Sequence, residues 1–167
     1  FIIISLGIVL PTMHHSGLGG LVVAAGDKVS PLWSTPWIAF LFLMTAIIIG
    51  FAIVVFEGSV SSLGFQKRVH LSHYTALFTM LRWILVFYLL VRFADISYRG
   101  AGGYVFETPL RTVAFIGENL AFIIPLFVLW SAKLRARKRY LFLAAVALLL
   151  GGALLRFNAL IVGFNAP

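Results

Sequence analysis

Residues 37–57 read WIAFLFLMTAIIIGFAIVVFE, and Glu57 at the end is the one charged residue in this stretch. The hydrocarbon core of a bilayer is ~30 Å thick, and a helix needs about 20 mostly apolar residues to cross it. The stretch has that length and that composition. It therefore predicts a transmembrane helix that ends at Glu57.

The whole chain of 167 residues shares this character, since 62% of its residues are hydrophobic, 11% are charged and the mean hydropathy is +1.06. Soluble domains do not reach such values. We therefore predict an all-α integral membrane helical bundle, as a single transmembrane domain over residues 1–167. Because the sequence opens at Phe1 inside an apolar run, we expect an internal part of a longer polypeptide and of a larger bundle. The expected spans are residues 1–25, 37–57, 74–95, 109–131 and 140–164.

The net charge of +8 comes from basic residues gathered in the joins between spans. This grouping fits the positive-inside rule better than a nucleic-acid-binding face, so no nucleic acid partner is expected. The second and fourth joins are therefore placed in the cytoplasm, and the membrane is predicted to be the inner membrane of a bacterium. Trp33 and Trp37 are expected to anchor the chain at the outer interface. The basic residues of the two cytoplasmic joins are Lys67, Arg68, Lys133, Arg135, Arg137, Lys138 and Arg139.

Four charged side chains fall well inside the predicted spans. On insertion scales each costs at least ~2.5–3.5 kcal/mol, so such residues face the bundle interior and have a partner. Arg82 and Glu118 come at matching depth near the midplane, and we expect them to pair, either as a structural ion pair or in a proton or quinone role. Arg92 and Arg156 are further candidates for a quinone site or a polar core.

Protonatable groups recur through the depth of the bilayer. Glu57 falls at the inner mouth, His14 or Glu118 at mid-depth, and Asp95 at the outer mouth. With water in the gaps, such a line can carry protons across the membrane. These four residues are the predicted proton-relay candidates.

His14 and His15 are adjacent near the middle of the first span, and they point about 100° apart around the helix axis. Only one of them can face the bundle directly. His14 is favoured because it shares a face with Gly7 and Pro11, where a small residue and a freed backbone carbonyl allow a ligand to approach. His15 remains the other candidate for binding a cofactor.

The nature of the cofactor follows from what the chain lacks. It contains no cysteine, so it forms no thiolate metal site and ligates no iron–sulfur cluster, and no metal ligands are predicted. The remaining histidines, His70 and His73, lie at the cytoplasmic end of the third span and do not match the depth of His14, so no haem is expected. A quinone is the expected ligand, because its carbonyls accept hydrogen bonds from histidine or arginine and its reduction takes up protons.

Six further blocks of the sequence form a recognisable pattern: GIVLPTMHHSGLGGL (7–21), DKVSPLW (27–33), GFAIVVFEGS (50–59), LVRFADISYR (90–99), GENLAFIIPLFVLWSAKLR (117–135) and LLRFNALIVGFN (154–165). In these blocks the chain resembles a known family, the NrfD/polysulfide-reductase family, and within it the HybB-type membrane subunits of quinone-linked nickel–iron hydrogenases. The resemblance implies a haem-free bundle that docks an iron–sulfur subunit and hydrogenase catalytic subunits on its outer face. It also implies electron exchange with menaquinone or ubiquinone, coupled in some members to proton movement.

The same resemblance implies roles for individual residues. His14 would belong to the quinone or proton-relay region, and Glu57 to the inner proton mouth. His15 stands where the family pattern has a polar amide, and Asp95 where it has a glutamate; both changes keep the polarity. The polar positions inside the bundle would be Arg92, Arg99, Glu118 and Arg156.

From the residues and the resemblance together, we expect a membrane subunit that passes electrons and protons between the iron–sulfur partner of a hydrogenase and membrane quinone. It would be part of an oxidoreductase without holding the active site for hydrogen. One alternative is a haem-b cytochrome anchor. The other is a secondary transporter, whose substrate would bind at helices broken near Pro11 and Pro125.

Overall fold

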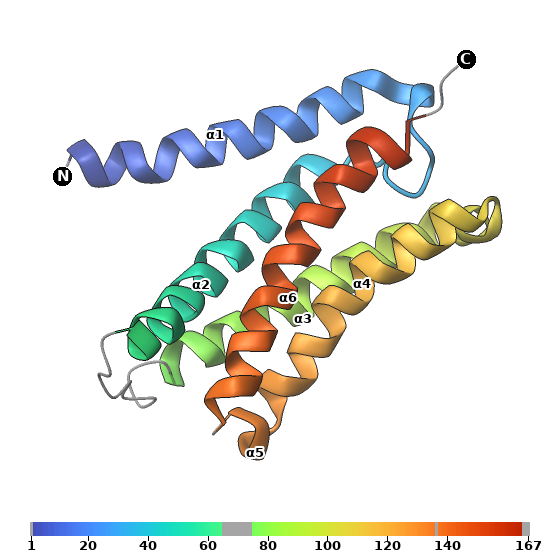
Figure 1. Cartoon of the computed structure of the whole chain (residues 1–167). Helices are drawn as coiled ribbons and strands as arrows, with labels where there is room; N and C mark the ends of the chain where they lie inside the picture. Colours follow the sequence, from blue (N-terminus) through green and yellow to red (C-terminus); the bar gives the residue numbers. More distant parts are fainter. Residues whose placement is uncertain (1, 65–74, 136, 165–167) are drawn as a thin grey trace.

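The computed structural model describes residues 2–64, 75–135 and 137–164, which are almost entirely helical (Figure 1). Within these ranges there is no strand, and a single isolated bridge joins Val29 to Phe164. The elements in chain order are α1 (Ile2–Ala25), η1 (Gly26–Lys28), α2 (Ile38–Gly64), α3 (Thr75–Tyr98), η3 (Ala101–Phe106), α4 (Pro109–Trp130), α5 (Ala132–Arg135), α6 (Lys138–Phe157) and η4 (Asn158–Val162).

Four helices of the described ranges are long and apolar enough to cross a membrane: Ile38–Ser61, Leu77–Tyr98, Pro109–Trp130 and Lys138–Val162. They coincide with the second to fifth expected spans, and the prediction of an all-α membrane bundle is confirmed. The first expected span forms α1, a continuous helix of 24 residues.

Helices α1 and α4 both continue through their internal prolines, Pro11 and Pro125. The missing amide hydrogen of a proline removes one helical hydrogen bond, but a neighbouring helix can make up for this in a membrane. Neither helix is interrupted, so neither provides the broken helix on which the transporter alternative depends.

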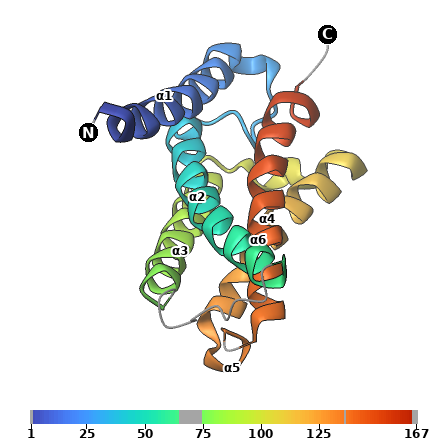
Figure 2. The same cartoon turned by 60° about the vertical axis from the view of Figure 1, so that its left-hand side comes forward.

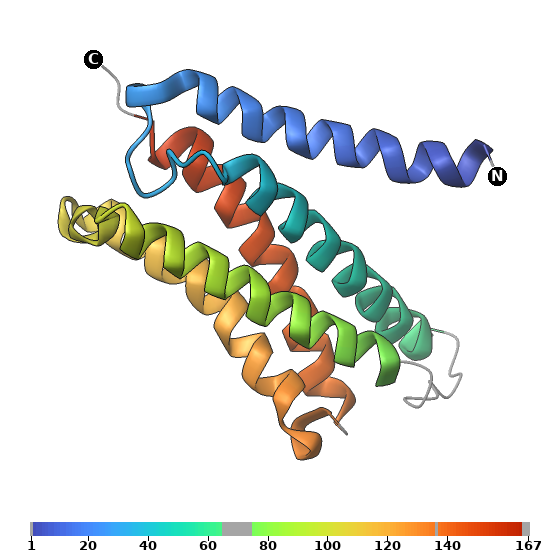
Figure 3. The ribbon, with the colours of Figure 1, turned by 180° about the vertical axis from the view of Figure 1, so that it is seen from behind.

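Helices α2, α3, α4 and α6 pack side by side, while α1 packs along α2 and its N-terminal part points away from the others (Figures 1 and 3). Glycine allows the close approach of α1. A side chain at Gly19 would overlap the backbone of Ala39, and one at Gly152 of α6 would overlap Ile49 of α2. Small residues at helix contacts are typical of membrane bundles, because dispersion contacts there replace the hydrophobic effect.

The two ends of the bundle differ in charge and in structure. One end, here called the loop end, carries the segment from Val29 to Trp37, the turn with η3, and η4. The opposite end, here called the basic end, carries α5 and the first turn of α6, at the bottom of Figure 2. Its basic residues are Lys133, Arg135, Arg137, Lys138 and Arg139.

The second predicted cytoplasmic join and the two predicted tryptophan anchors differ in how the structure bears on them. Lys67 and Arg68 of the other predicted cytoplasmic join, together with His70 and His73, lie outside the described residues. Trp33 does not lie at the membrane surface as predicted: its ring is fully buried, whereas Trp37 is 57% exposed. Hydropathy places a tryptophan near a helix end but cannot tell whether the following loop folds inward.

Candidate functional site

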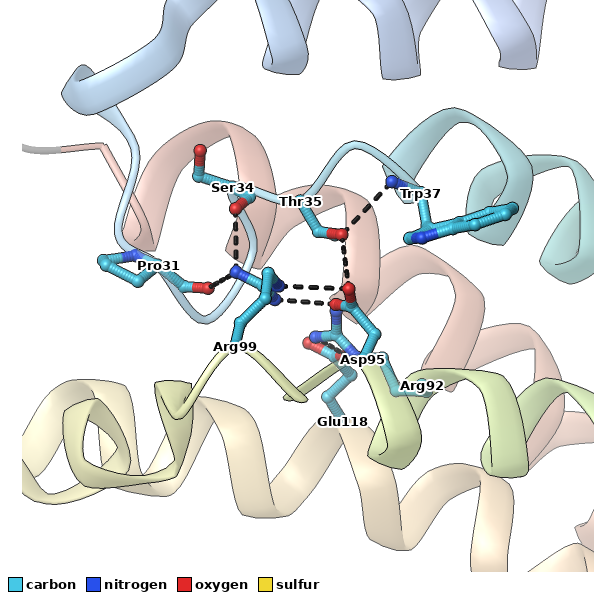
Figure 4. Close-up of polar contacts among 8 residues, drawn as sticks. All are labelled: Pro31, Ser34, Thr35, Trp37, Arg92, Asp95, Arg99 and Glu118. Carbon is cyan, nitrogen blue, oxygen red and sulfur yellow. Dashed lines mark hydrogen bonds and ion pairs between the residues drawn. The ribbon is translucent and has the colours of Figure 1, made fainter. Parts of the chain in front are cut away.

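The carboxylate of Glu118 is the centre of a buried polar cluster near the middle of α4. Its Oε1 pairs with Nη2 of Arg92 on α3 at 3.1 Å, and both side chains are fully buried (Figure 4). Its Oε2 accepts hydrogen bonds from Nε1 of Trp33 and Nδ2 of Asn158, each at 2.9 Å. Three donors from three different parts of the chain thus converge on one carboxylate. Such a buried charge persists only when paired and hydrogen-bonded in this way.

Asn158 reaches Glu118 because α6 changes from an α-helix to a π-helical turn at this residue. Its Nδ2 also donates to the carbonyl oxygen of Ala114, one turn before Glu118, at 3.0 Å. The π-helical turn η4 continues to Val162, and the next amide nitrogen, that of Gly163, bonds back to the Asn158 carbonyl at 2.6 Å. Single π turns are frequent at functional sites, where they redirect side chains.

The expected pairing of Arg82 with Glu118 is wrong. Arg82 instead lies over two indole rings, with its Cζ 4.9 Å from the ring centroid of Trp130 and 5.5 Å from that of Trp83. Trp130 follows Glu118 along α4 by about 18 Å at the helical rise. The prediction estimated depth by counting residues from the helix ends, which says nothing of the register of α3 against α4. In the structure, that register places Arg92, rather than Arg82, beside Glu118.

A second polar cluster joins the end of α3 to the loop between η1 and α2 (Figure 4). Arg99 pairs with Asp95 through two hydrogen bonds, Nε to Oδ1 at 3.0 Å and Nη2 to Oδ2 at 2.7 Å. Nη1 of Arg99 donates to the carbonyl oxygens of Pro31 and Ser34 at 2.7 and 3.0 Å. The hydroxyl of Thr35 completes the set by donating to Asp95 Oδ1 at 2.9 Å. This cluster fixes the loop that places Trp33 on Glu118.

A third cluster surrounds Arg156 of α6. Its Nη1 donates to the carbonyl oxygen of Gly152 at 2.6 Å, and Nη2 to that of Phe42 at 3.3 Å. Nη2 also lies 3.2 Å from Nδ1 of His15. Because a guanidinium has only donors, Nδ1 must accept this bond, and the proton of a neutral His15 then sits on Nε2.

His15, rather than His14, is the histidine that faces the described bundle. The side chain of His15 is half-buried against Arg156, whereas that of His14 is exposed. The prediction that His14 is the histidine facing the bundle is therefore wrong for the contacts within this chain. Proline and a small residue on one face indicate where a ligand can approach, but they do not indicate which face meets the neighbouring helix.

Several buried donors in these clusters have no acceptor among the described residues. They are Nε and Nη1 of Arg92, Nε of Arg156 and the hydroxyl of Tyr88. Tyr88 is fully buried and packs against Phe122, with ring centroids 4.9 Å apart at an angle of 55°, and it interacts electrostatically with Arg92, Glu118 and Arg156. An unsatisfied buried donor costs about 1–3 kcal/mol. The region is therefore suited to a polar ligand that accepts hydrogen bonds.

The structure places five of the site candidates found from sequence in these three clusters: Arg92 and Glu118 in the first, Asp95 in the second, and Arg156 and His15 in the third. Glu57 stands apart from them, exposed toward the far end of α2.

Sequence reasoning missed Trp33, Thr35, Tyr88 and Asn158. An asparagine inside an apolar span is a visible signal, and Asn158 could have been found by it. The other three belong to residue types that are common at helix ends and interfaces, so their burial is decided by tertiary packing.

The polysulphide reductase, NrfD family model matches residues 2–167. A probable Ni/Fe-hydrogenase 2 b-type cytochrome subunit of Escherichia coli (strain K12) is 40% identical over 168 residues, which cover 99% of this chain and 43% of the relative. A protein of Nitratidesulfovibrio vulgaris (strain Hildenborough) is 26% identical over 167 residues, which cover 95% of this chain and 42% of that relative. The chain thus spans about two fifths of the length of these relatives. No solved structure matches it.

The name of the E. coli relative overturns the prediction that no haem is bound, because a b-type cytochrome subunit is a haem protein by name. A haem held between two helices takes an axial ligand such as histidine from each. The histidines of the described ranges, His14 and His15, are neighbours on α1 with ring centroids 5.7 Å apart. The described residues also contain no group of three or more His, Cys, Asp or Glu side chains that could hold a metal ion. By themselves they do not fit a haem with two histidine ligands.

Proposed function

Because the chain belongs to the polysulphide reductase NrfD family, we propose that it is part of the membrane subunit of a nickel–iron hydrogenase complex. In this proposal the subunit passes electrons and protons between an iron–sulfur partner protein and quinone in the membrane. The relative named as a hydrogenase 2 subunit supports the choice of complex. Hydrogen itself would be oxidised on other subunits.

The observation that carries the proposal is the set of unsatisfied donors beside Glu118. A quinone, menaquinone or ubiquinone, would supply carbonyl oxygens that accept hydrogen bonds, and it takes up two electrons and two protons on reduction. Arg92 would donate from Nε or Nη1 to such an oxygen, with Tyr88 as a second donor. Glu118 holds the guanidinium of Arg92 in place through Nη2 and leaves its other nitrogens free to donate.

An apolar surface suited to the isoprenoid tail lies nearby. An open groove of about 420 Å³ runs on the lipid side of α3 and α4, lined by residues that include Leu89, Phe93 and Leu126. Leu89 and Phe93 flank Arg92 in the sequence of α3. A lipid-soluble ligand could therefore approach this part of the bundle from within the bilayer.

Proton transfer is assigned to the carboxylates and histidines at three levels. Asp95 would hold protons at the loop end, and Glu118 and His15 would hold them near mid-depth. Glu57 would exchange protons with the opposite side. By the positive-inside rule the basic end would lie in the cytoplasm of a bacterium, and the iron–sulfur partner would dock at the loop end, on the outer side of the inner membrane.

Replacing His15 with alanine tests the proposal on α1. The Arg156 guanidinium loses a hydrogen bond of a charged group, worth about 1.5–3 kcal/mol, so hydrogen-driven quinone reduction should fall by about tenfold or more. The same substitution at His14 is the matched control, because His14 is exposed and adjacent. Hydrogen oxidation with a soluble dye should stay unchanged in both variants of the full complex. Equal quinone-linked rates in the wild type and both variants would contradict the role of His15.

The b-type cytochrome named among the relatives favours a second candidate function, a haem-carrying subunit. Its ligands would come from His70 and His73 or from the part of the relatives beyond this chain. The test is the reduced-minus-oxidised absorbance spectrum of the purified full-length protein. A b-type Soret band that disappears in a His70→Ala, His73→Ala variant would assign haem ligation to this chain. A b-type band that survives would place the ligands elsewhere.

A further inference from the structure

The surroundings of Arg82 at the basic end are not used by the proposed function. Its guanidinium lies against the rings of Trp83 and Trp130, which are themselves 6.2 Å apart between centroids at an angle of 67°. Its Nε is buried and has no hydrogen-bond acceptor among the described residues. This arginine thus lies against two indoles, with its Nε buried and without an acceptor among the described residues.

Arg82 takes part in none of the ion pairs among the described residues. The carboxylates that form ion pairs in the described ranges are Asp95, Glu107 and Glu118, and they pair with Arg99, Arg111 and Arg92 away from the basic end. The connection that follows Trp130 adds further positive charge, with Lys133 exposed and Arg135 half-buried. An anion at this end would meet several cations, and the one described acid toward this end, Glu57 of α2, is exposed and belongs to none of these ion pairs.

The position of the site points to the lipid headgroup region. Trp130 is the last residue of α4, and Trp83 and Trp130 are 57% and 54% exposed on the outside of the bundle. Tryptophan is enriched where hydrocarbon meets the headgroups. Arg82 lies about 10 Å along α3 from Thr75, a depth from which an arginine can reach the interface.

We propose that Arg82, held between Trp83 and Trp130, binds the phosphate of an anionic phospholipid at the basic end of the bundle. The planar guanidinium presents paired donors that match phosphate oxygens, and the indoles support it without using its donors. The acyl chains would lie along the exposed apolar faces of α3 and α4. Basic pockets between transmembrane helices are known to bind such headgroups.

The test counts bound lipids on the full-length protein in its complex, purified in detergent and incubated with cardiolipin or phosphatidylglycerol. Native mass spectrometry should show one anionic lipid retained per chain in the wild type, whereas phosphatidylcholine is not retained. In Arg82→Gln the apparent dissociation constant should rise by about fivefold or more, since one arginine near an anionic surface is worth ~1 kcal/mol. Arg82→Lys keeps the positive charge but lacks the paired donors of the guanidinium, so its apparent dissociation constant for the lipid should lie between those of the wild type and Arg82→Gln.

Arg111→Gln is the matched control, because it removes one positive charge from an exposed ion pair at the loop end. It should retain the lipid as the wild type does. If the Arg82→Gln and Arg82→Lys variants melt at the wild-type temperature and retain the lipid as strongly as the wild type does, the proposal is overturned. Displacement of the lipid by millimolar inorganic phosphate would also overturn it, because the site would then recognise a free anion rather than a headgroup.

Discussion

Replacing Glu118 with alanine is expected to lower the free energy of unfolding by about 3–5 kcal/mol, the usual cost of removing one partner from a buried ion pair. Arg92 would stay buried without a counter-ion, and Trp33 and Asn158 would each lose their shared acceptor. The measurement is thermal unfolding of the full-length protein in detergent, followed by loss of helical circular dichroism. Quinone-linked hydrogen oxidation should fall below detection.

Two further variants separate stability from function at this site. The double variant Arg92→Met, Glu118→Leu removes both charges, and apolar residues of similar volume are often neutral or stabilising in place of a buried pair. It should recover most of the lost stability without recovering the quinone-linked rate. Glu107→Gln breaks a partly exposed pair with Arg111 and should change stability by no more than about 0.5 kcal/mol. An active double variant would refute the role given to Arg92 and Glu118.

Replacing Arg99 with alanine is expected to release the loop from Val29 to Trp37. Four hydrogen bonds are lost at once, two to the Asp95 carboxylate and two to the carbonyls of Pro31 and Ser34. The loss of several charge-assisted bonds is worth at least ~3 kcal/mol. Hydrogen exchange of the loop amides should therefore accelerate by about a hundredfold or more, because exchange reports the free energy of local opening.

The matched control for Arg99 is Arg111→Ala on the neighbouring helix, which should leave exchange in the loop at the wild-type rate. Arg99→Lys should restore part of the protection, since an ammonium can meet one carboxylate and one carbonyl but lacks the planar fork. Unchanged exchange in Arg99→Ala would show that the loop is held by its other contacts, such as the 2.6 Å bond from the Ser30 amide to the Gly163 carbonyl.

Hydropathy predicted the helices well because the bilayer imposes one length scale on every span. The predicted 109–131 became Pro109–Trp130, and 140–164 became a continuous run over Lys138–Val162. The Thr108 side chain and Pro109 at the first helical position explain the sharp start of α4. The π-helical turn at Asn158 was not predicted, because no pattern of apolar residues distinguishes a π-helical turn from the α-helix that it continues.

The site was predicted in part, and the family resemblance is confirmed by the match over residues 2–167. The charges inside the spans were identified because a charge in hydrocarbon is costly and conspicuous. The partner predicted for Glu118, Arg82, was wrong, because the pairing depends on the relative register and rotation of α3 and α4. Trp33 was predicted at the membrane interface and is buried for a similar reason: a loop held by Arg99 turns it inward, and no local pattern encodes that contact.

The ion pair between Arg92 and Glu118 also bears on how the chain enters the membrane during synthesis. It joins α3 to α4, which follow one another along the chain with only a short turn between them. Each helix alone would present an unpaired charge to the lipid, at a cost of at least ~2.5–3.5 kcal/mol. As a hairpin the two charges neutralise each other. We therefore expect α3 to remain at the translocon until α4 has been synthesised, so that both helices pass into the bilayer together.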